Sequence, residues 1–279
     1  MVVPVQDRFV TVNGLKLHYR EWGEAGNPPL LLVHGLTRES HAFDRLAPAL
    51  AGRFRCIAMD VRGRGDSDWG APEDYSIAQY AADVRGLLAV LGLEQVHYIG
   101  VSMGGIISFE LAAETPGLLL SLAVNDMGPQ IAADSSQAVG DHVRRCGEGF
   151  DSLTELLDFE TIRYPWYAQT PRPLLEESYQ HLVRHQEDGR VTFHFDPNIV
   201  LGRTSTASGV GERYWEAWRK LTCPLLLVRG AESNILVPET VRRMQAAQPE
   251  MAFVEVPGVG HAPTLMEKPV LAAFDALYA

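Results

Sequence analysis

A serine lies between two glycines in the segment GVSMGG (residues 100–105), which has the pattern G-x-S-x-G. The apolar run VHYIG precedes it, and the helical pattern MGGIISFELAAE continues from it. In a strand–turn–helix context, glycines at these places permit a sharp turn that exposes the serine hydroxyl at the helix N-terminus. The helix dipole and the N–H of Met103 favour negative charge there. We predict that Ser102 is a nucleophile; a merely structural glycine-rich turn is the alternative.

The segment VPGVGHAPTLMEKP (256–269) places His261 between the last predicted strand and the last predicted helix. An imidazole within hydrogen-bond reach of a serine can take its proton and return it to a leaving group. Most of the other histidines fall in predicted strands, in a hairpin or in the helical region, where a structural role suffices. We predict His261 as the general base; a capping or surface role is the alternative.

A carboxylate must hold this imidazole in the correct tautomer, and the sequence offers two. Glu232 lies in GAESNILVP (230–238), after the apolar run PLLLVR, where a solvated loop residue would look the same. Asp126 lies in LAVNDMGP (122–129), at the end of the strand that follows the nucleophile helix. The carboxyl ends of parallel strands share the edge that carries the site, and Asp126 keeps the order Ser, Asp, His. We predict Asp126 as the acid, with Glu232 or a bracing role for Asp126 as alternatives.

At this point the chain resembles the α/β-hydrolase superfamily over nearly its whole length. LLLVHGL (30–36) is similar to the superfamily's His-Gly segment after the third strand, and DVRGRGDSD (60–68) to its D-x-R-G-x-G-x-S loop. The resemblance implies that the N–H groups of Leu36 and Met103 form an oxyanion hole. From HGLTRES to GVGH the chain is similar to hydrolases of the 2-(acetamidomethylene)succinate hydrolase type. That similarity implies a triad acid after the sixth strand, where Asp126 lies.

Short apolar runs alternate with helical patterns, which predicts an α/β fold with a parallel sheet covered on both faces. The runs are LLLV (30–33), FRCIAM (54–59), VHYIG (96–100), LLLSLAV (118–124), PLLLVRG (224–230) and AFVEVPG (252–258). RFVTVNGLKLHYREW alternates around Asn13-Gly14 and predicts a hairpin. We expect an α/β-hydrolase fold with a mostly parallel eight-stranded sheet in a core domain of residues 1–128 and 221–279. The stretch 129–220 is mostly helical, without a clear strand run, and is predicted to be an inserted helical cap.

The cap is expected to supply substrate contacts. Tyr164, Trp166 and Tyr167 form an aromatic cluster around a proline, although aromatic residues at such spacing also build the interior of a cap. Arg38, just past the oxyanion segment, is placed to meet a substrate carboxylate, or it is a solvated loop charge. These four residues are candidates for substrate binding.

The 279 residues carry a net charge of −11, without a block of clustered Lys or Arg. This argues against nucleic-acid and anionic-membrane partners, which select basic patches. Cys56, Cys146 and Cys223 are widely spaced, and we expect reduced thiols, no metal site and no cofactor. No signal peptide or membrane-spanning run is evident, so a cytoplasmic location is the default expectation, and a homodimer is compatible with the sequence.

The leading hypothesis is a cofactor-independent, carboxylesterase-like serine hydrolase that acts on a small-molecule carboxylic ester and water. An amide, a lactone or a carbon–carbon bond would suit the same three catalytic residues. A different class, a ligand receptor without catalytic activity, would fit the absence of an aspartate after PLLLVRG. Reaction with a fluorophosphonate probe would separate the two classes.

Overall fold

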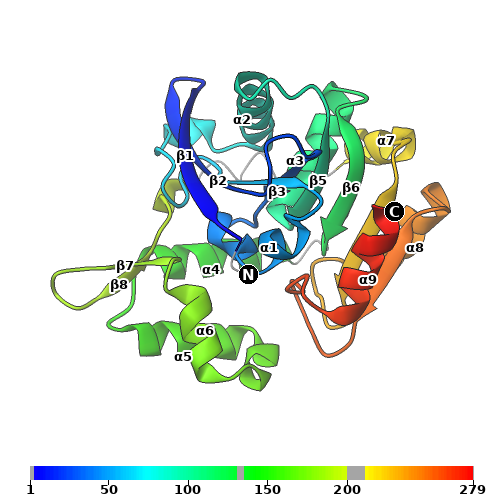
Figure 1. Ribbon diagram of the computed structural model, residues 1–279. Helices are drawn as coiled ribbons and strands as arrows, with labels where there is room; N and C mark the ends of the chain where they lie inside the picture. The colour runs from blue at the N-terminus through cyan, green and yellow to red at the C-terminus, as the bar shows by residue number, and fades with distance from the viewer. Residues whose placement is uncertain (1–2, 131–134, 200–210, 279) are drawn as a thin grey trace.

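An eight-stranded sheet forms the centre of the molecule (Figure 1). The computed structural model describes residues 3–130, 135–199 and 211–278. Neighbouring strands follow the order β1-β2-β4-β3-β5-β6-β9-β10, and β2 runs antiparallel to all the other strands, which are parallel to one another. The strands are β1 (Val5–Val12), β2 (Leu15–Trp22), β3 (Pro29–Val33), β4 (Arg55–Met59), β5 (Val96–Val101), β6 (Leu119–Asn125), β9 (Leu225–Gly230) and β10 (Ala252–Val256). The predicted fold is confirmed.

Helices cover both faces of the sheet because its central strands are apolar on both sides. In β3, Leu31 and Val33 pack into a cluster with residues of α2 and α3, whereas Leu30 and Leu32 pack into a second cluster with α1 and α9. The helices that cover the sheet are α1 (Leu46–Leu50), α2 (Ile77–Val90), α3 (Met103–Glu114), α8 (Pro238–Ala247) and α9 (Lys268–Leu277). No helix among the described residues is long and apolar enough to cross a membrane.

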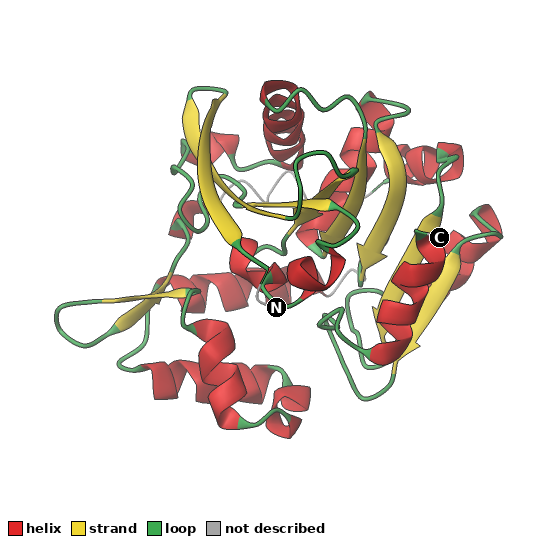
Figure 2. Ribbon diagram, in the orientation of Figure 1, coloured by secondary structure: helices red, strands yellow, loops and turns green. Residues whose placement is uncertain are grey.

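Between β6 and β9 the chain leaves the sheet and builds a smaller, largely helical layer, at the lower left of Figure 1. Figure 2 shows that this layer also holds a short hairpin, β7 and β8, which the sequence did not predict. Each of its strands has three residues, too few for a recognisable alternation. The elements are α4 (Ser135–Gly147), α5 (Leu153–Arg163), the 3₁₀ helix η3 (Pro165–Gln169), α6 (Arg172–Tyr179), β7 (Val183–His185) and β8 (Val191–Phe193).

The helix before β9, α7 (Glu212–Lys220), packs on the core helix α3. The rings of Phe109 and Trp218 meet edge to face at 5.9 Å, and Arg213 lies 2.9 Å from the carboxylate of Glu110. Part of the stretch 129–220 therefore lies against the core, and the limits of the two domains remain a prediction.

The segment after β8 is hydrogen-bonded to the glycine-rich loop at residues 60–68. The N–H of Gly65 donates to the carbonyl of His194 at 3.0 Å, and the N–H of Asp196 donates to the carbonyl of Gly63 at 2.8 Å. The hydroxyl of Tyr75 adds a bond to the Asp196 carboxylate. This loop therefore fastens one edge of the cap layer to the core.

Candidate active site

Ser102 lies in the sharp turn between β5 and α3, with φ of +52° and ψ of −111°. This left-handed conformation is strained for a serine. The turn closes because the neighbouring glycines have no side chain. A Cβ on Gly104 would lie 2.1 Å from the carbonyl oxygen of Val33, and one on Gly100 would lie 2.5 Å from the backbone of Gly104. The N–H of Ser102 donates to the carbonyl of Asn125 at 3.0 Å, which ties the turn to β6.

The imidazole of His261 bridges Ser102 and Asp126. Its Nε2 lies 2.7 Å from the Ser102 hydroxyl, and its Nδ1 lies 2.7 Å from Oδ2 of Asp126. Because a carboxylate only accepts, Nδ1 carries the proton and donates to Asp126, which leaves Nε2 free to accept from the serine hydroxyl. The structure thus brings together the three residues that the sequence singled out, from loops after β5, β6 and β10.

Asp126 is fully buried and receives donors from several sides. The N–H of Gly230 donates to Oδ1 at 3.0 Å, and the hydroxyl of Ser233 donates to Oδ2 at 2.5 Å. Its own N–H donates to the carbonyl of Val228 at 2.8 Å, so the left-handed residue, with φ of +55°, is fixed to β9. Hydrogen bonds of this kind to a carboxylate are stronger than neutral ones and fix its orientation toward His261.

Glu232 lies in the same loop as Ser233 but its side chain is exposed. Its backbone N–H donates to the carbonyl of Val259 at 2.9 Å, which braces the loop that carries His261. The geometry therefore pairs His261 with Asp126 and not with Glu232. Ser233 was not among the residues predicted from the sequence, and its role as a donor to Asp126 was missed.

The two expected oxyanion donors lie on either side of Ser102. Met103 is the first residue of α3, and the first N–H groups of a helix have no acceptor within the helix. Leu36 follows Gly35, and a Cβ on Gly35 would lie 3.5 Å from the Cβ of Ser102. The oxyanion segment therefore passes directly beside the serine.

Arg64, which the sequence did not single out, contacts both of these residues. Its Nε donates to the carbonyl of Leu36 at 3.0 Å, and its Nη2 lies 3.6 Å from the sulfur of Met103. The side chain is completely buried, and its Nη1 also donates to the hydroxyl of Tyr80 at 2.9 Å. No carboxylate of the described residues lies within ion-pair distance of this guanidinium. A buried positive charge thus backs the oxyanion segment.

His34, at the start of the oxyanion segment, is held as a neutral imidazole. Its Nδ1 donates to the carbonyl of Gly35 at 2.6 Å, and its Nε2 accepts the N–H of Val61 at 3.0 Å. Complete burial lowers the pKa of this imidazole to about 4. His34 therefore positions the segment and has no free nitrogen for proton transfer.

The predicted substrate-binding residues lie where the cap meets the core. Nη2 of Arg38 donates to the hydroxyls of Tyr167 at 3.2 Å and Tyr179 at 3.0 Å, so this core side chain reaches into the cap. Trp166 covers the loop that carries His261, because a Cβ on Gly260 would lie 2.1 Å from its ring.

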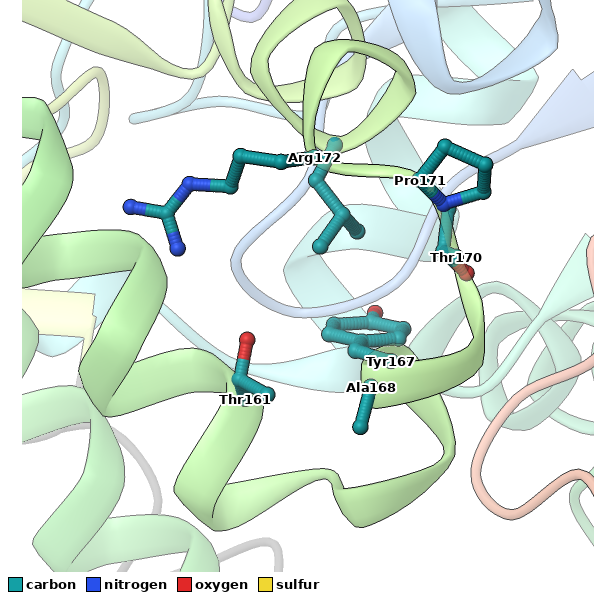
Figure 3. A pocket seen from close by; sticks show the side chains of 7 residues that line it. Thr161, Tyr167, Ala168, Thr170, Pro171 and Arg172 are labelled. Carbon is teal, nitrogen blue, oxygen red and sulfur yellow. The ribbon is translucent and has the colours of Figure 1, made fainter.

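Aromatic packing joins the cap residues to one another. The ring of Tyr164 lies 5.3 Å from that of Trp166 and 5.4 Å from that of Tyr167. Figure 3 shows that Tyr167 also faces a pocket between α5 and α6, together with Thr161 and Arg172. The triad does not line that pocket, so the cap carries a hollow of its own.

The chain belongs to the α/β-hydrolase fold family, because a profile of that family matches residues 28–267. It is a hydrolase of this superfamily. It is 36% identical over 261 residues to the 3-hydroxybutyrate-oligomer hydrolase of Cupriavidus necator, covering 90% of this chain and 89% of that one. It is 30% identical over 256 residues to the 2-(acetamidomethylene)succinate hydrolase of Mesorhizobium japonicum, covering 91% and 88%.

Among solved structures, an α/β hydrolase from Novosphingobium aromaticivorans superposes with a TM-score of 0.87 at 32% identity, covering 99% of both chains. The expected membership of the superfamily and the similarity to the 2-(acetamidomethylene)succinate hydrolase type are confirmed.

Proposed function

We propose that this protein is a serine hydrolase that cleaves a small carboxylic ester through an acyl-enzyme. The observation that carries the proposal is the bridge of His261 between Ser102 and Asp126, with 2.7 Å on each side. A buried carboxylate, an oriented imidazole and a strained, partly exposed serine form the arrangement that activates a hydroxyl as a nucleophile.

In the first half of the reaction, Ser102 Oγ attacks the ester carbonyl while Nε2 of His261 takes the hydroxyl proton. The N–H groups of Leu36 and Met103 stabilise the negative charge that develops on the carbonyl oxygen. His261 then gives the proton to the leaving alkoxide, and the alcohol departs. In the second half, water attacks the acyl group with His261 as base, and the carboxylic acid is released. Asp126 stabilises the imidazolium in both halves.

The activities named for the two relatives support an ester as the bond that is cleaved, and an amide as the second candidate. A hydrolase of 3-hydroxybutyrate oligomers, which are joined by ester bonds, matches nine-tenths of this chain at 36% identity. A hydrolase named for an acetamide-bearing substrate matches a similar share at 30% identity. Arg38, beside the oxyanion segment, would provide a cation for a carboxylate at the far end of such a substrate.

Two measurements test the proposal. A fluorophosphonate probe is expected to label the wild type and not Ser102→Ala. If the wild type is folded and is not labelled, the proposal is wrong. Hydrolysis rates are then compared over p-nitrophenyl esters of increasing acyl length, 3-hydroxybutyrate oligomers, lactones and acetamides. We expect the highest kcat/KM with a short ester; an acetamide that is cleaved faster than every ester would favour the second reading.

A further inference from the structure

Three side chains of the kinds that bind transition metals meet inside the cap. His142 and Cys146 lie one turn apart on α4, and Glu160 faces them from α5. The sulfur of Cys146 is 3.5 Å from Nε2 of His142, which in turn is 3.4 Å from Oε1 of Glu160. All three ligand atoms lie within 4.8 Å of one another, and all three residues are buried.

Two of these three separations match a tetrahedral metal site. Zinc binds sulfur at about 2.3 Å and nitrogen or oxygen at about 2.0–2.2 Å, so tetrahedral neighbours lie roughly 3.3–3.7 Å apart. The sulfur–nitrogen and nitrogen–oxygen distances given above fall within this range. One central ion could therefore reach His142, Cys146 and Glu160 with little movement, and a water molecule would complete four-coordination.

The two carboxylate oxygens of Glu160 differ in their hydrogen bonding. Its Oε2 accepts the hydroxyl of Tyr179 at 2.6 Å. Its Oε1 has no hydrogen-bond partner among the residues that the structure describes, and the side chain is only 2% exposed. A buried carboxylate oxygen normally has a partner, so an unpartnered one that faces an imidazole and a thiol points to a missing ligand. The hydrogen bond from Tyr179 is of the kind that orients a metal-binding carboxylate.

The imidazole of His142 is held in a fixed direction by an aromatic neighbour. Its plane lies parallel to the ring of Phe159 at 5.7 Å. A metal bound at this place would take Cys146 as a thiolate and His142 as a neutral imidazole, as metal ligands require.

The ligand set of the cluster favours a metal that bonds to sulfur, which must also offset the positive charge of nearby arginines. The guanidiniums of Arg38, Arg163 and Arg145 act on these three residues and oppose a cation held by charge alone. A thiolate and a carboxylate together offset a divalent ion. Thiolate and imidazole ligands select zinc and similar ions over magnesium or calcium, which prefer oxygen.

We propose that His142, Cys146 and Glu160 bind one thiophilic divalent cation, of which Zn²⁺ is the representative, within the cap. The sequence predicted no metal site, because a histidine and a cysteine four apart lack a third ligand until α5 folds against α4. Through Glu160 and Tyr179 the ion would lie two hydrogen bonds from Arg38, so its presence would stiffen the contact between the cap and the oxyanion segment.

Cobalt(II) titration of the full chain, after treatment with a chelator, tests the proposal. We expect one equivalent to bind with a thiolate-to-cobalt charge-transfer band, and Zn²⁺ to displace it and raise the melting temperature by several degrees. The matched variants are Cys146→Ser and Cys223→Ser, since Cys223 is a half-buried cysteine outside the cluster. The band should vanish in the first and persist in the second.

Absence of the thiolate band in the wild type, or its persistence in Cys146→Ser, would overturn the proposal. Cobalt bound at the partly exposed group of His41, Asp44 and His181 would give no such band, because that group has no sulfur. If Cys146→Ser does not fold, His142→Gln takes its place. Fluorophosphonate labelling of each variant reports the serine site separately, so failure here is distinct from failure of the hydrolase assignment.

Discussion

At the scale of single residues, the acid of the triad is the position with two rival candidates. Asp126 is buried and bonded to His261, Gly230 and Ser233, whereas the side chain of Glu232 is exposed. We expect Asp126→Asn to lower kcat on p-nitrophenyl acetate by about 10⁴-fold, because an amide can stabilise the wrong imidazole tautomer. Glu232→Gln should stay within about 2-fold of wild type, since only surface charge changes. The reverse ranking of the two variants would refute this assignment.

Arg64 supports a second prediction about a residue that does not touch the triad. Its guanidinium fixes the carbonyl of Leu36 and contacts Met103, so it positions the oxyanion donors and places positive charge behind them. We expect Arg64→Met to lower kcat about 10-fold or more with little change in KM, and Arg64→Lys to recover part of the loss. One lost oxyanion donor costs about 10²–10³-fold, and an indirect role should cost less.

The control for Arg64 is Arg85→Met, which removes a half-exposed guanidinium paired with Glu114. It should leave both kinetic constants unchanged, because its partner lies on the outside of α3. Circular dichroism of both variants checks folding. A rise in KM at constant kcat for Arg64→Met would indicate a role in binding and contradict the positioning role.

At the scale of elements, the contact between η3 and the histidine loop should be tight enough to detect. Gly260 has no room for a methyl group, which would meet the ring of Trp166 at 2.1 Å. We expect Gly260→Ala to destabilise the protein by about 1–3 kcal/mol in urea unfolding, the usual range for overpacking. In a protein that already carries Trp166→Ala, the same Gly260→Ala substitution should lower the free energy of unfolding much less, because the ring that the methyl group would meet is gone. Equal costs of Gly260→Ala with and without Trp166 would show that the two do not collide.

The lengths of the elements also explain which parts of the structure could be predicted from the sequence. The parallel strands could be predicted because each is a short apolar run between turn residues, and the first two strands because they alternate around Asn13-Gly14. Ser102, Asp126 and His261 each lie within three residues of the end of an apolar run. The hairpin of β7 and β8 could not, because three-residue strands carry no pattern. The roles of Ser233 and Arg64 could not either, since Asp126 lies 107 residues from Ser233 and Leu36 lies 28 residues from Arg64, and each pair meets only in the folded chain.

At the scale of the whole molecule, buried neutral histidines should make the fold sensitive to acid. The pKa of His34 is about 4 in the folded state and near 6.5 in the unfolded chain, so the unfolded chain binds the proton first. The contribution of the neutral His34 to the free energy of unfolding is therefore fully present above pH 6.5 and decreases as the pH drops toward 4. At pH 5 it has decreased by about 2 kcal/mol. His142 shifts in the same direction and adds to the loss.

Urea unfolding at pH 7 and pH 5 measures this dependence. The comparison with His34→Gln isolates one histidine, because glutamine keeps a donor and an acceptor but does not titrate. We expect His34→Gln to have a lower free energy of unfolding than the wild type at pH 7. Its decrease in free energy of unfolding from pH 7 to pH 5 should be about 2 kcal/mol smaller than that of the wild type. Equal losses would exclude His34 as the cause.

The hydrogen bond of 2.5 Å from Ser233 to Asp126 also bears on how such an enzyme could change during evolution. It means that the loop after β9 lies against the loop after β6, so a carboxylate in place of Ser233 would lie beside the carboxylate that is bonded to His261. An ancestor with a carboxylate in both loops would have carried two acids in contact, sharing one proton as paired carboxylates do. Either acid could then be lost without an inactive intermediate. Such a protein would allow the acid to move between the two loops by single substitutions.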